Sequence, residues 1–288
     1  MLTRRFSLVA LVLFAAGCAS ETSSDESTGA TSDEVRVCAS GSTLRGIDVS
    51  YYQGSVDWAK VKSSGRAFAF ARVSDGTSHI DSKFSSNWPK MKSAGLTRGA
   101  YQFFRPARDP SAQAQVFLDK LAAAGGLRAG DLPPVLDLET SDGVASSTVV
   151  ARAKTWLNKV QSATGIKPII YTGRQMENVL GTSFSSYYLW VANYGVSCPG
   201  LPRGWTSWKF WQSSQTGSVS GVSGPVDLDT FNGSSSALAA ITKKGLFEPE
   251  PGPTMDPPGE ITPFSPEEGQ FGATLGHPFP DTDSTDSE

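Results

Sequence analysis

The chain has 288 residues, of which 39% are hydrophobic, so it can form one large domain or two small ones with a sizeable core. Residues 44–245 contain one histidine, His79, and no GxxxxGK[ST] motif, which excludes a Ser-His-Asp hydrolase, a His-ligated zinc site and a phosphate loop. The formal net charge is only −3, and we expect neither a metal nor a cofactor.

The N-terminus is typical of an export signal, which we assign to residues 1–18. Arg4 and Arg5 precede an apolar run that is too short to span a membrane, and small residues then lead to Cys18. The AAGC sequence resembles the bacterial lipobox, which implies cleavage before Cys18 and acylation of its thiol. An ordinary signal peptide cut nearby is the alternative. We therefore expect an exported protein, either secreted or attached to the cell envelope only through a lipid on Cys18.

Two segments have the composition of disordered chain. Residues 19–43 are rich in Ser, Thr, Asp and Glu, which predicts a flexible acidic tether, and residues 246–288 form an acidic, Pro-rich tail. Cys38 and Cys198 are the cysteines that remain after the signal. In an exported protein we expect them to form a disulfide, with two separate buried thiols as the alternative.

Charge is distributed unevenly along the chain. Residues 44–245 carry 22 Lys and Arg against 13 Asp and Glu, whereas residues 246–288 carry ten acidic residues and no basic ones. A basic folded region favours an anionic polymer as partner, although a solvated surface without a partner has the same composition. Export favours the cell wall over nucleic acid, so we expect no nucleic-acid partner.

Strand-like and helix-like runs alternate five times in the first part of the folded region. The strand-like runs are LRGIDVS, AFAFARVS, TRGAYQFF, PPVLDLE and KPIIYTG, each followed by a helix-like run. Asp109 with Pro110 is a helix start, and Gly95, Gly125 and Gly165 are helix stops.

After about residue 181 the helix-like runs are absent, and SSYYLWVANY, SWKFWQSS and PVDLDTF are typical of strands. Eight strands with mainly parallel connections predict an α/β fold. We expect an irregular, TIM-like (β/α) barrel over residues 44–245, whose last three strands lack regular helices.

Asp137 and Glu139 follow the apolar start of PPVLDLETSDG. Side chains two apart on a strand point the same way, with Cα atoms about 6.6 Å apart, so both carboxylates can contact one ligand. Like charges side by side are unfavourable and indicate a functional role. A strand that merely ends in water is the simpler alternative.

Reactive groups of (β/α) barrels lie at the C-terminal ends of the strands. Acidic residues at such positions also include Asp48, Asp75, Asp227 and Asp229. Carboxylates surrounded by aromatic rings suit sugar chemistry, because sugar faces stack on rings while carboxyls protonate or bridge hydroxyls. Core packing is the alternative for any single ring. The candidate substrate-binding residues are Tyr101, Phe103, Tyr171, Trp190, Tyr194, Trp211 and Gln212, and Tyr51 and Trp208 are further aromatic residues at this level.

The blocks RGIDVSYYQG, FAFARVSDG, RGAYQFFR, PPVLDLE, PIIYTG, YLWVANYG, WKFWQ and VDLDTFNG occur in this order. With them, residues 44–241 resemble glycoside hydrolase family 25, the Chalaropsis-type lysozymes. The resemblance implies an irregular (β/α) barrel. It also implies an N-acetylmuramidase that cuts the β-1,4 bond between N-acetylmuramic acid and N-acetylglucosamine in peptidoglycan glycan strands.

The same resemblance implies roles for four carboxylates. Glu139 is the proton donor, and Asp137 orients or stabilises the substrate's 2-acetamido group in a substrate-assisted, retaining route, although an inverting route has also been argued. Asp48 and Asp227 match the acids of the family's first and last strands. A carboxylate such as Asp137 next to Glu139 raises the pKa of Glu139, as a proton donor near neutral pH requires.

The sequence departs from the family pattern at several positions. Arg72 and Asp75 replace the lysine and glutamate of a K-A-T-E-G block, Gln102 replaces the histidine of YHF, and Asp229 replaces an asparagine. These changes motivate an alternative function, a non-catalytic peptidoglycan-binding lipoprotein on the same barrel. A chitinase-like hydrolase is disfavoured, because the D-x-x-D-x-D-x-E motif is absent. We expect a monomer.

Overall fold

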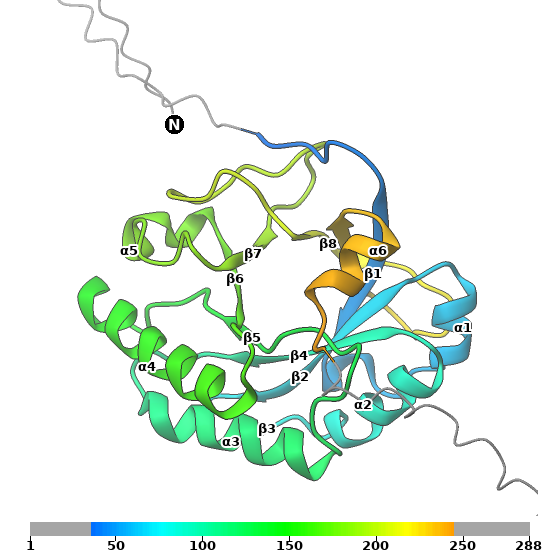
Figure 1. Cartoon of the computed structure of the whole chain (residues 1–288), viewed down its shortest axis with the longest axis horizontal. Helices are drawn as coiled ribbons and strands as arrows, with labels where there is room; N and C mark the ends of the chain where they lie inside the picture. Colours follow the sequence, from blue (N-terminus) through cyan, green and yellow to red (C-terminus); the bar gives the residue numbers. More distant parts are fainter. Residues whose placement is uncertain (1–35, 245–288) are drawn as a thin grey trace, which may run out of the picture. The chain divides into compact units, whose positions relative to one another are not determined.

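Eight strands form a closed barrel, shown in Figure 1 together with the helices that flank it. The computed structural model describes residues 36–244. The predicted signal peptide with Cys18, the predicted tether up to residue 35 and the predicted tail from residue 246 lie outside the described residues. The strands are β1 (Thr43–Val49), β2 (Phe68–Asp75), β4 (Thr97–Phe103), β5 (Val135–Asp137), β6 (Ile169–Gly173), β7 (Tyr188–Ala192), β8 (Phe210–Gly217) and β9 (Val226–Asn232).

The order around the barrel is β1-β9-β8-β7-β6-β5-β4-β2, and pairing of β1 with β2 closes the ring. All neighbours run parallel except β9, which is antiparallel to both β8 and β1. A two-residue strand, β3 (His79–Ile80), pairs antiparallel with the end of β2. The predicted α/β barrel with mainly parallel strands is confirmed.

Helices follow the early strands, as predicted. They are α1 (Trp58–Ser63), α2 (Phe84–Ser93), α3 (Pro110–Ala123), α4 (Ser146–Thr164) and α5 (Glu177–Leu180), with short 3₁₀ turns η1 (Tyr51–Gln53) and η2 (Arg174–Met176). Within residues 36–244, no helix has the length and apolar character needed to cross a membrane.

The local start and stop signals lie where the sequence predicts them. The Asp109 carboxylate accepts a hydrogen bond from the Ala112 amide at 2.7 Å, with Pro110 as the first residue of α3. Gly165 ends α4 with a φ of 70°, a left-handed conformation that favours glycine.

One detail of the fold prediction is corrected: a short helix, α6 (Ser235–Ile241), follows β9. Its start is stabilised by the Ser234 hydroxyl, which accepts a hydrogen bond from the Ala237 amide at 3.3 Å. Leu238 is buried among the residues that fill the barrel interior. The helix forms because its apolar face covers this part of the core, a tertiary contact that the short sequence run does not reveal.

Aromatic and aliphatic side chains fill much of the barrel interior. The interior cluster consists of Phe68, Phe70, Tyr101, Leu132, Val135, Ile169, Tyr171, Trp190, Phe210, Phe231 and Leu238. Rings of this size fit because small residues face them: a Cβ at Gly46 would overlap the Phe68 ring, and a Cβ at Gly99 would overlap the Phe70 ring. Large and small residues therefore alternate around the closed sheet.

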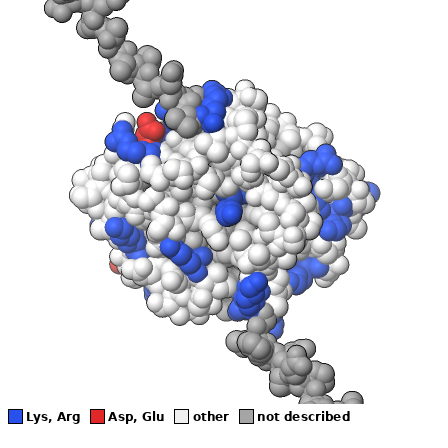
Figure 2. Space-filling view, turned by 45° about the horizontal axis from the view of Figure 1, so that its top comes forward, with Lys and Arg blue, Asp and Glu red and all other residues white. Residues whose placement is uncertain are grey.

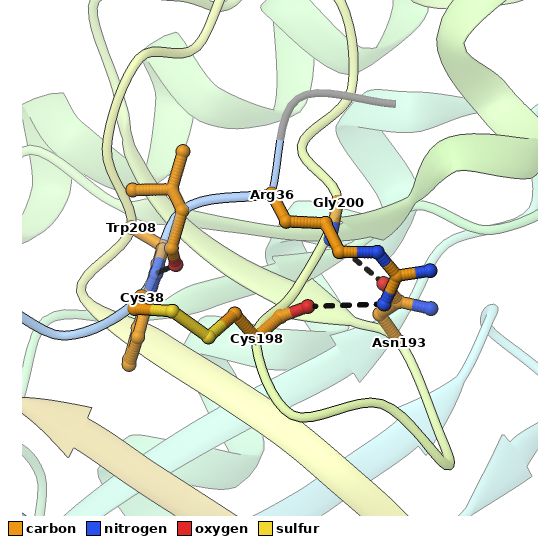
Figure 3. Close-up of a disulfide and its surroundings, with 7 residues drawn as sticks. Arg36, Cys38, Asn193, Cys198, Gly200 and Trp208 are labelled. Carbon is orange, nitrogen blue, oxygen red and sulfur yellow. Dashed lines mark hydrogen bonds between the residues drawn. A yellow bond between two sulfur atoms is a disulfide. The ribbon is translucent and has the colours of Figure 1, made fainter. Parts of the chain in front are cut away.

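The segment before β1 is fastened to the loop between β7 and β8 (Figure 3). Cys38 and Cys198 form a disulfide, and the Val37 amide donates to the Pro199 carbonyl at 3.0 Å. The Trp208 indole donates to the Val37 carbonyl at 2.6 Å. The predicted flexible tether is therefore corrected for residues 36–43, which are bonded to the barrel and include the first residue of β1.

Gly99→Ala should destabilise the fold, because the added methyl would overlap the buried ring of Phe70 and lie 3.3 Å from Leu132. Overpacking of this kind costs about 1–3 kcal/mol, measurable as a lower urea midpoint. Gly41→Ala is the matched control, since a Cβ at this position would meet nothing within 4 Å. Equal stability of the two variants would show that the interior is loosely packed.

Candidate active site

A pocket of about 240 Å³ opens at the barrel mouth where the parallel strands end. Its lining includes ten of the eleven residues that the sequence predicts as catalytic or substrate-binding: Asp48, Tyr101, Phe103, Asp137, Glu139, Tyr171, Trp190, Tyr194, Gln212 and Asp227. Four further lining residues were not selected from the sequence as site residues: Ser50, Tyr52, Arg72 and Gln215.

Asp137 and Glu139 point into this pocket from the end of β5. Leu136 and Leu138, which alternate with them, are buried in the outer cluster between sheet and helices. The Leu138 amide donates to the Tyr171 carbonyl at 2.9 Å, so the strand-like alternation continues beyond the last residue of β5. The alternation predicted from DLE therefore brings both carboxyls to one cavity.

Asp227 reaches the same cavity by a different route. It lies near the N-terminal end of β9, and because β9 runs antiparallel, this end meets the C-terminal ends of its neighbours. Asp227 is paired with Asp48 in the register of β1 and β9. The reversal of one strand thus places an acid from a strand start beside acids from strand ends.

Gln212 connects Asp48 to two tyrosines. Its amide nitrogen donates to Asp48 Oδ2 at 2.6 Å. Its amide oxygen accepts hydrogen bonds from the hydroxyls of Tyr171 at 2.7 Å and Tyr194 at 2.6 Å. These three bonds fix the orientation of the Gln212 amide, and with it the position of the Asp48 carboxyl.

Trp190 forms the floor of the pocket. Its ring stacks on Phe70 at 4.2 Å between centroids and makes edge contacts with Tyr101 and Tyr171. Its indole nitrogen donates to Asp229 Oδ1 at 2.9 Å. Asp229 is therefore a buried support under the floor, and it does not line the pocket.

Burial is the main electrostatic feature of these carboxyls. It raises the pKa of Asp48 well above its usual range, with further contributions from the charges of Asp229 and Asp227, while the Gln212 hydrogen bond lowers it. Burial likewise raises the pKa of Asp227 and raises that of Asp229 well above its usual range. The pocket therefore retains protons that exposed carboxyls would lose.

The pair Asp137 and Glu139 differs from the sequence-based expectation in one respect. Burial raises the pKa of Glu139, and the Arg105 charge opposes this rise. Burial and then the charge of Glu139 raise the pKa of Asp137 well above its usual range. Their repulsion thus raises the pKa of Asp137, the more deeply buried acid, more than that of Glu139. The pair is best treated as a unit that shares protons.

Arg72 lines the pocket from β2 and is held by Asp81. Arg72 Nε donates to Asp81 Oδ2 at 3.2 Å, and the same oxygen accepts from the Tyr51 amide at 2.8 Å. The guanidinium lies 5.2 Å and 5.6 Å from the ring centroids of Tyr51 and Tyr52. Tyr52 is 73% exposed, so its ring is at the pocket rim and not in the core.

Trp211 is the candidate substrate-binding residue that the structure does not bring to the pocket. It alternates with Phe210 and Gln212, which face the barrel interior, and its indole donates to the Asn193 carbonyl at 2.7 Å. Trp208 also packs in the outer cluster. The sequence could not decide which of two alternating sets on this strand faces inward.

Gln102 also points away from the pocket. Its side chain lies between the barrel and α4, where it accepts from the Trp156 indole at 2.5 Å and donates to the Ser74 hydroxyl at 2.7 Å. Gln102, where YQF departs from the family pattern, therefore does not line the pocket. Asp75 likewise lies outside the pocket, where Arg105 binds both of its oxygens at 2.6 Å.

Residues 47–222 match the family model for glycosyl hydrolases family 25. The chain belongs to glycoside hydrolase family 25. It is 40% identical over 217 residues to Lysozyme M1 of Streptomyces globisporus, covering 70% of this chain and 72% of that protein. It is 38% identical over 205 residues to the uncharacterised protein YegX of Escherichia coli strain K12, covering 69% and 73%.

Among solved structures, the family 25 barrel is similar to the bacterial lysozyme from Streptomyces coelicolor. The TM-score is 0.65 at 37% identity, and the match covers 70% of this chain and 97% of that one. The part of this chain outside the match is about as long as residues 1–43 and 246–288 together.

The surface of this family 25 domain is more basic than its composition suggests. Five of the 13 acidic residues in 44–245 are buried, namely Asp48, Asp81, Asp131, Asp137 and Asp229. On the face drawn in Figure 2, Lys and Arg side chains are widely spread and acidic side chains are few. Such a surface favours an anionic polymer.

Within residues 36–244, no group of three or more His, Cys, Asp or Glu is arranged to hold a metal ion.

Asp229→Asn should change how stability depends on pH. The folded state holds the Asp229 proton to higher pH than the unfolded chain, so this contribution is complete below about pH 3.9 and is lost as pH rises through the folded-state pKa. The free energy of unfolding should therefore fall less with rising pH in the variant than in the wild type. Asn can still accept the Trp190 hydrogen bond.

Urea unfolding across a pH series measures this slope. Asp119→Asn, which removes an exposed carboxylate on α3, is the matched control and should leave the wild-type slope unchanged. Identical slopes for Asp229→Asn and wild type would mean that Asp229 stays ionised in the folded protein.

Proposed function

We propose that this family 25 protein is a muramidase that hydrolyses the β-1,4 bond between N-acetylmuramic acid and N-acetylglucosamine in peptidoglycan. The observation that carries the proposal is the convergence of Asp137 and Glu139 with Asp48 and Asp227 on one aromatic-lined pocket. Two carboxyls beside a scissile glycosidic bond supply an acid and a stabilising charge. The match to Lysozyme M1 supports the same reaction.

Glu139 is assigned as the proton donor. Its carboxyl is partly buried and lines the pocket, and burial raises its pKa, which favours a retained proton near neutral pH. In the proposed first step, the Glu139 proton passes to the glycosidic oxygen as the bond to the anomeric carbon breaks. Glu139 then accepts a proton from the water that completes hydrolysis.

Asp137 is assigned to the substrate's 2-acetamido group. Its Oδ1 atom is buried at the pocket and has no hydrogen-bond partner within residues 36–244. An unsatisfied buried acceptor is costly, and an acetamido N–H would satisfy it. Held in this way, the acetamido oxygen attacks the anomeric carbon, and water later opens the resulting ring with retention of configuration.

Asp48 and Asp227 are assigned to positioning and charge stabilisation on the other side of the pocket. Asp48 is held by Gln212, and both acids act on the electrostatics of the cavity through their mutual repulsion. Arg72 and the exposed ring of Tyr52 supply a cation and a stacking surface at the rim, which suit a hydroxylated sugar chain.

We also propose that the protein acts outside the cytoplasm. The Cys38–Cys198 disulfide is typical of oxidising compartments, and peptidoglycan lies there. Lipid attachment at Cys18 after removal of the preceding signal residues is part of this proposal and is tested by mass spectrometry of the mature N-terminus. Monomeric behaviour is tested by sedimentation.

Glu139→Gln should lower turnover by about 10²–10⁴-fold while leaving the fold and wall binding intact, because the amide keeps the shape but cannot deliver a proton. The release of reducing ends from purified sacculi measures turnover, and co-sedimentation with sacculi measures binding. Glu177→Gln on α5, outside the pocket, is the matched control and should keep wild-type turnover.

Two outcomes would redirect the assignment. A Glu139→Gln variant with more than about a tenth of wild-type turnover would remove Glu139 from the acid role. Wild-type protein that binds sacculi without releasing reducing ends would support the alternative, a non-catalytic wall-binding protein.

Asp137→Asn should move the alkaline limb of the activity profile to lower pH. In the wild type the two acids repel each other, so the pair keeps its last proton to higher pH than a single carboxyl in the same place. Asn removes that repulsion, so Glu139 loses its proton earlier. Turnover itself should also fall strongly, because Asn cannot carry the negative charge that Asp137 bears when the shared proton lies on Glu139.

The pH dependence of kcat/KM on sacculi measures the limb in both proteins. An alkaline limb at the same pH in Asp137→Asn and wild type would mean that the two acids are not electrostatically coupled.

A further inference from the structure

A second pocket, of about 550 Å³, lies beside the proposed active site. Three segments of the chain, residues 72–75, 103–105 and 139–142, contribute to the lining of both pockets. Phe103, Glu139 and Arg72 line the first pocket. Arg105, Asp142 and Asp75, each two or three residues further along the chain, line the second. The second pocket therefore adjoins the first on the side of the β2, β4 and β5 ends.

One wall of this pocket is the tip of the hairpin between β2 and β3. Gly76 at the tip donates its amide to the Phe103 carbonyl at 2.9 Å, which joins the hairpin to the end of β4. Thr77, Ser78 and His79 follow and are exposed in the pocket. Within residues 36–244, none of these three side chains makes a hydrogen bond.

The opposite wall is the loop between β4 and α3, and it is held firmly. Buried Gln113 accepts from the Arg105 amide at 2.9 Å and donates to the Arg105 carbonyl at 2.9 Å. Arg152 Nη1 donates to the Pro106 carbonyl at 2.6 Å. A loop fixed at several points presents its side chains without a further loss of backbone freedom.

The floor between the walls is an ion-pair network whose members bind one another. Arg105 binds both oxygens of Asp75 at 2.6 Å and approaches Asp142 Oδ1 at 3.5 Å. Asp142, the non-glycine residue with positive φ in the described chain, also accepts from the Ala107 amide at 3.4 Å. The turn after Glu139 is thus fastened to the loop that carries Arg108.

Arg108 also lines this pocket, and its guanidinium has no hydrogen-bond or ion-pair partner among residues 36–244. Both acids of this pocket, Asp75 and Asp142, are already bound by Arg105. The guanidinium of Arg108 is therefore left to bind a ligand. With free hydroxyls nearby, it is complementary to a carboxylate with adjacent amides. The proposed glycan substrate carries such a group: the peptide arm on its muramic acid unit projects sideways from the sugar chain and ends in carboxylates.

We propose that this pocket is a subsite for the peptide arm of the wall polymer, in which Arg108 binds a carboxylate while the glycan occupies the adjoining active site. The inference rests on the proposed function for its substrate. Arg108 acts in binding and specificity and takes no part in bond cleavage. Strands that carry peptides should therefore be preferred over bare glycan.

Binding of two soluble probes to the full chain tests this subsite by NMR titration. N-acetylmuramyl-L-alanyl-D-glutamate carries the peptide carboxylates, and N-acetylmuramic acid carries only its own lactyl carboxylate. Neither probe has a glycosidic bond to cut, so affinity is read independently of turnover. Arg108→Glu should weaken binding of the peptide probe by about tenfold or more and leave the sugar probe unchanged.

Arg203→Glu is the matched control, since Arg203 is an exposed arginine between β7 and β8 that lines neither pocket. It makes the same change in net charge and should affect neither probe. The subsite is refuted if wild-type protein does not bind the peptide probe. Equal effects of Arg108→Glu on both probes, or of both variants on the peptide probe, would also refute it.

Turnover on matched walls adds a second readout. Arg108→Glu should lower kcat/KM on peptide-bearing strands and leave it unchanged on strands stripped of peptides by an amidase. If wild-type protein releases reducing ends from neither substrate, the proposed hydrolysis fails, while the probe titration still decides the subsite.

Discussion

Strand β9 enters the barrel antiparallel to both of its neighbours, and the grouping of the pocket acids depends on this reversal. It allows β9 to complete the sheet between β8 and β1 and sets Asp227 opposite Asp48. The same strand brings Asp229 beneath Trp190. A parallel last strand would carry its first residues to the other end of the barrel, where they could not act with Asp137 and Glu139.

Packed side chains fill one part of the barrel interior, and the acids of the pocket line the other part. Aromatic rings fill much of the interior and exclude water, and Trp190 forms the boundary with the polar layer above. Acids in that layer are poorly solvated, so burial raises their pKa values more than any single neighbour does. The packing that stabilises the fold is thus also the cause of the proton retention proposed for catalysis.

The loop after β7 links the N-terminal segment to this polar layer. Asn193 accepts from the Gly200 amide at 2.7 Å close to the Cys198 disulfide, as Figure 3 shows, and Tyr194 next to it bonds to Gln212. Gln212 in turn holds Asp48. A covalent link made outside the barrel therefore restrains a chain of contacts that ends at a pocket carboxyl.

The sequence by itself determined the features that depend on neighbouring residues. Alternation along PPVLDLE placed Asp137 and Glu139 on one side, and the Asp109 cap and Gly165 stop bounded their helices. It could not determine which alternate set of WKFWQ faces inward, so Trp211 and Gln212 were both selected although only Gln212 lines the pocket. Strand direction, the outward position of Gln102 and the pairing of Arg105 with Asp75 were decided only by tertiary structure, because each depends on which distant strand becomes the neighbour.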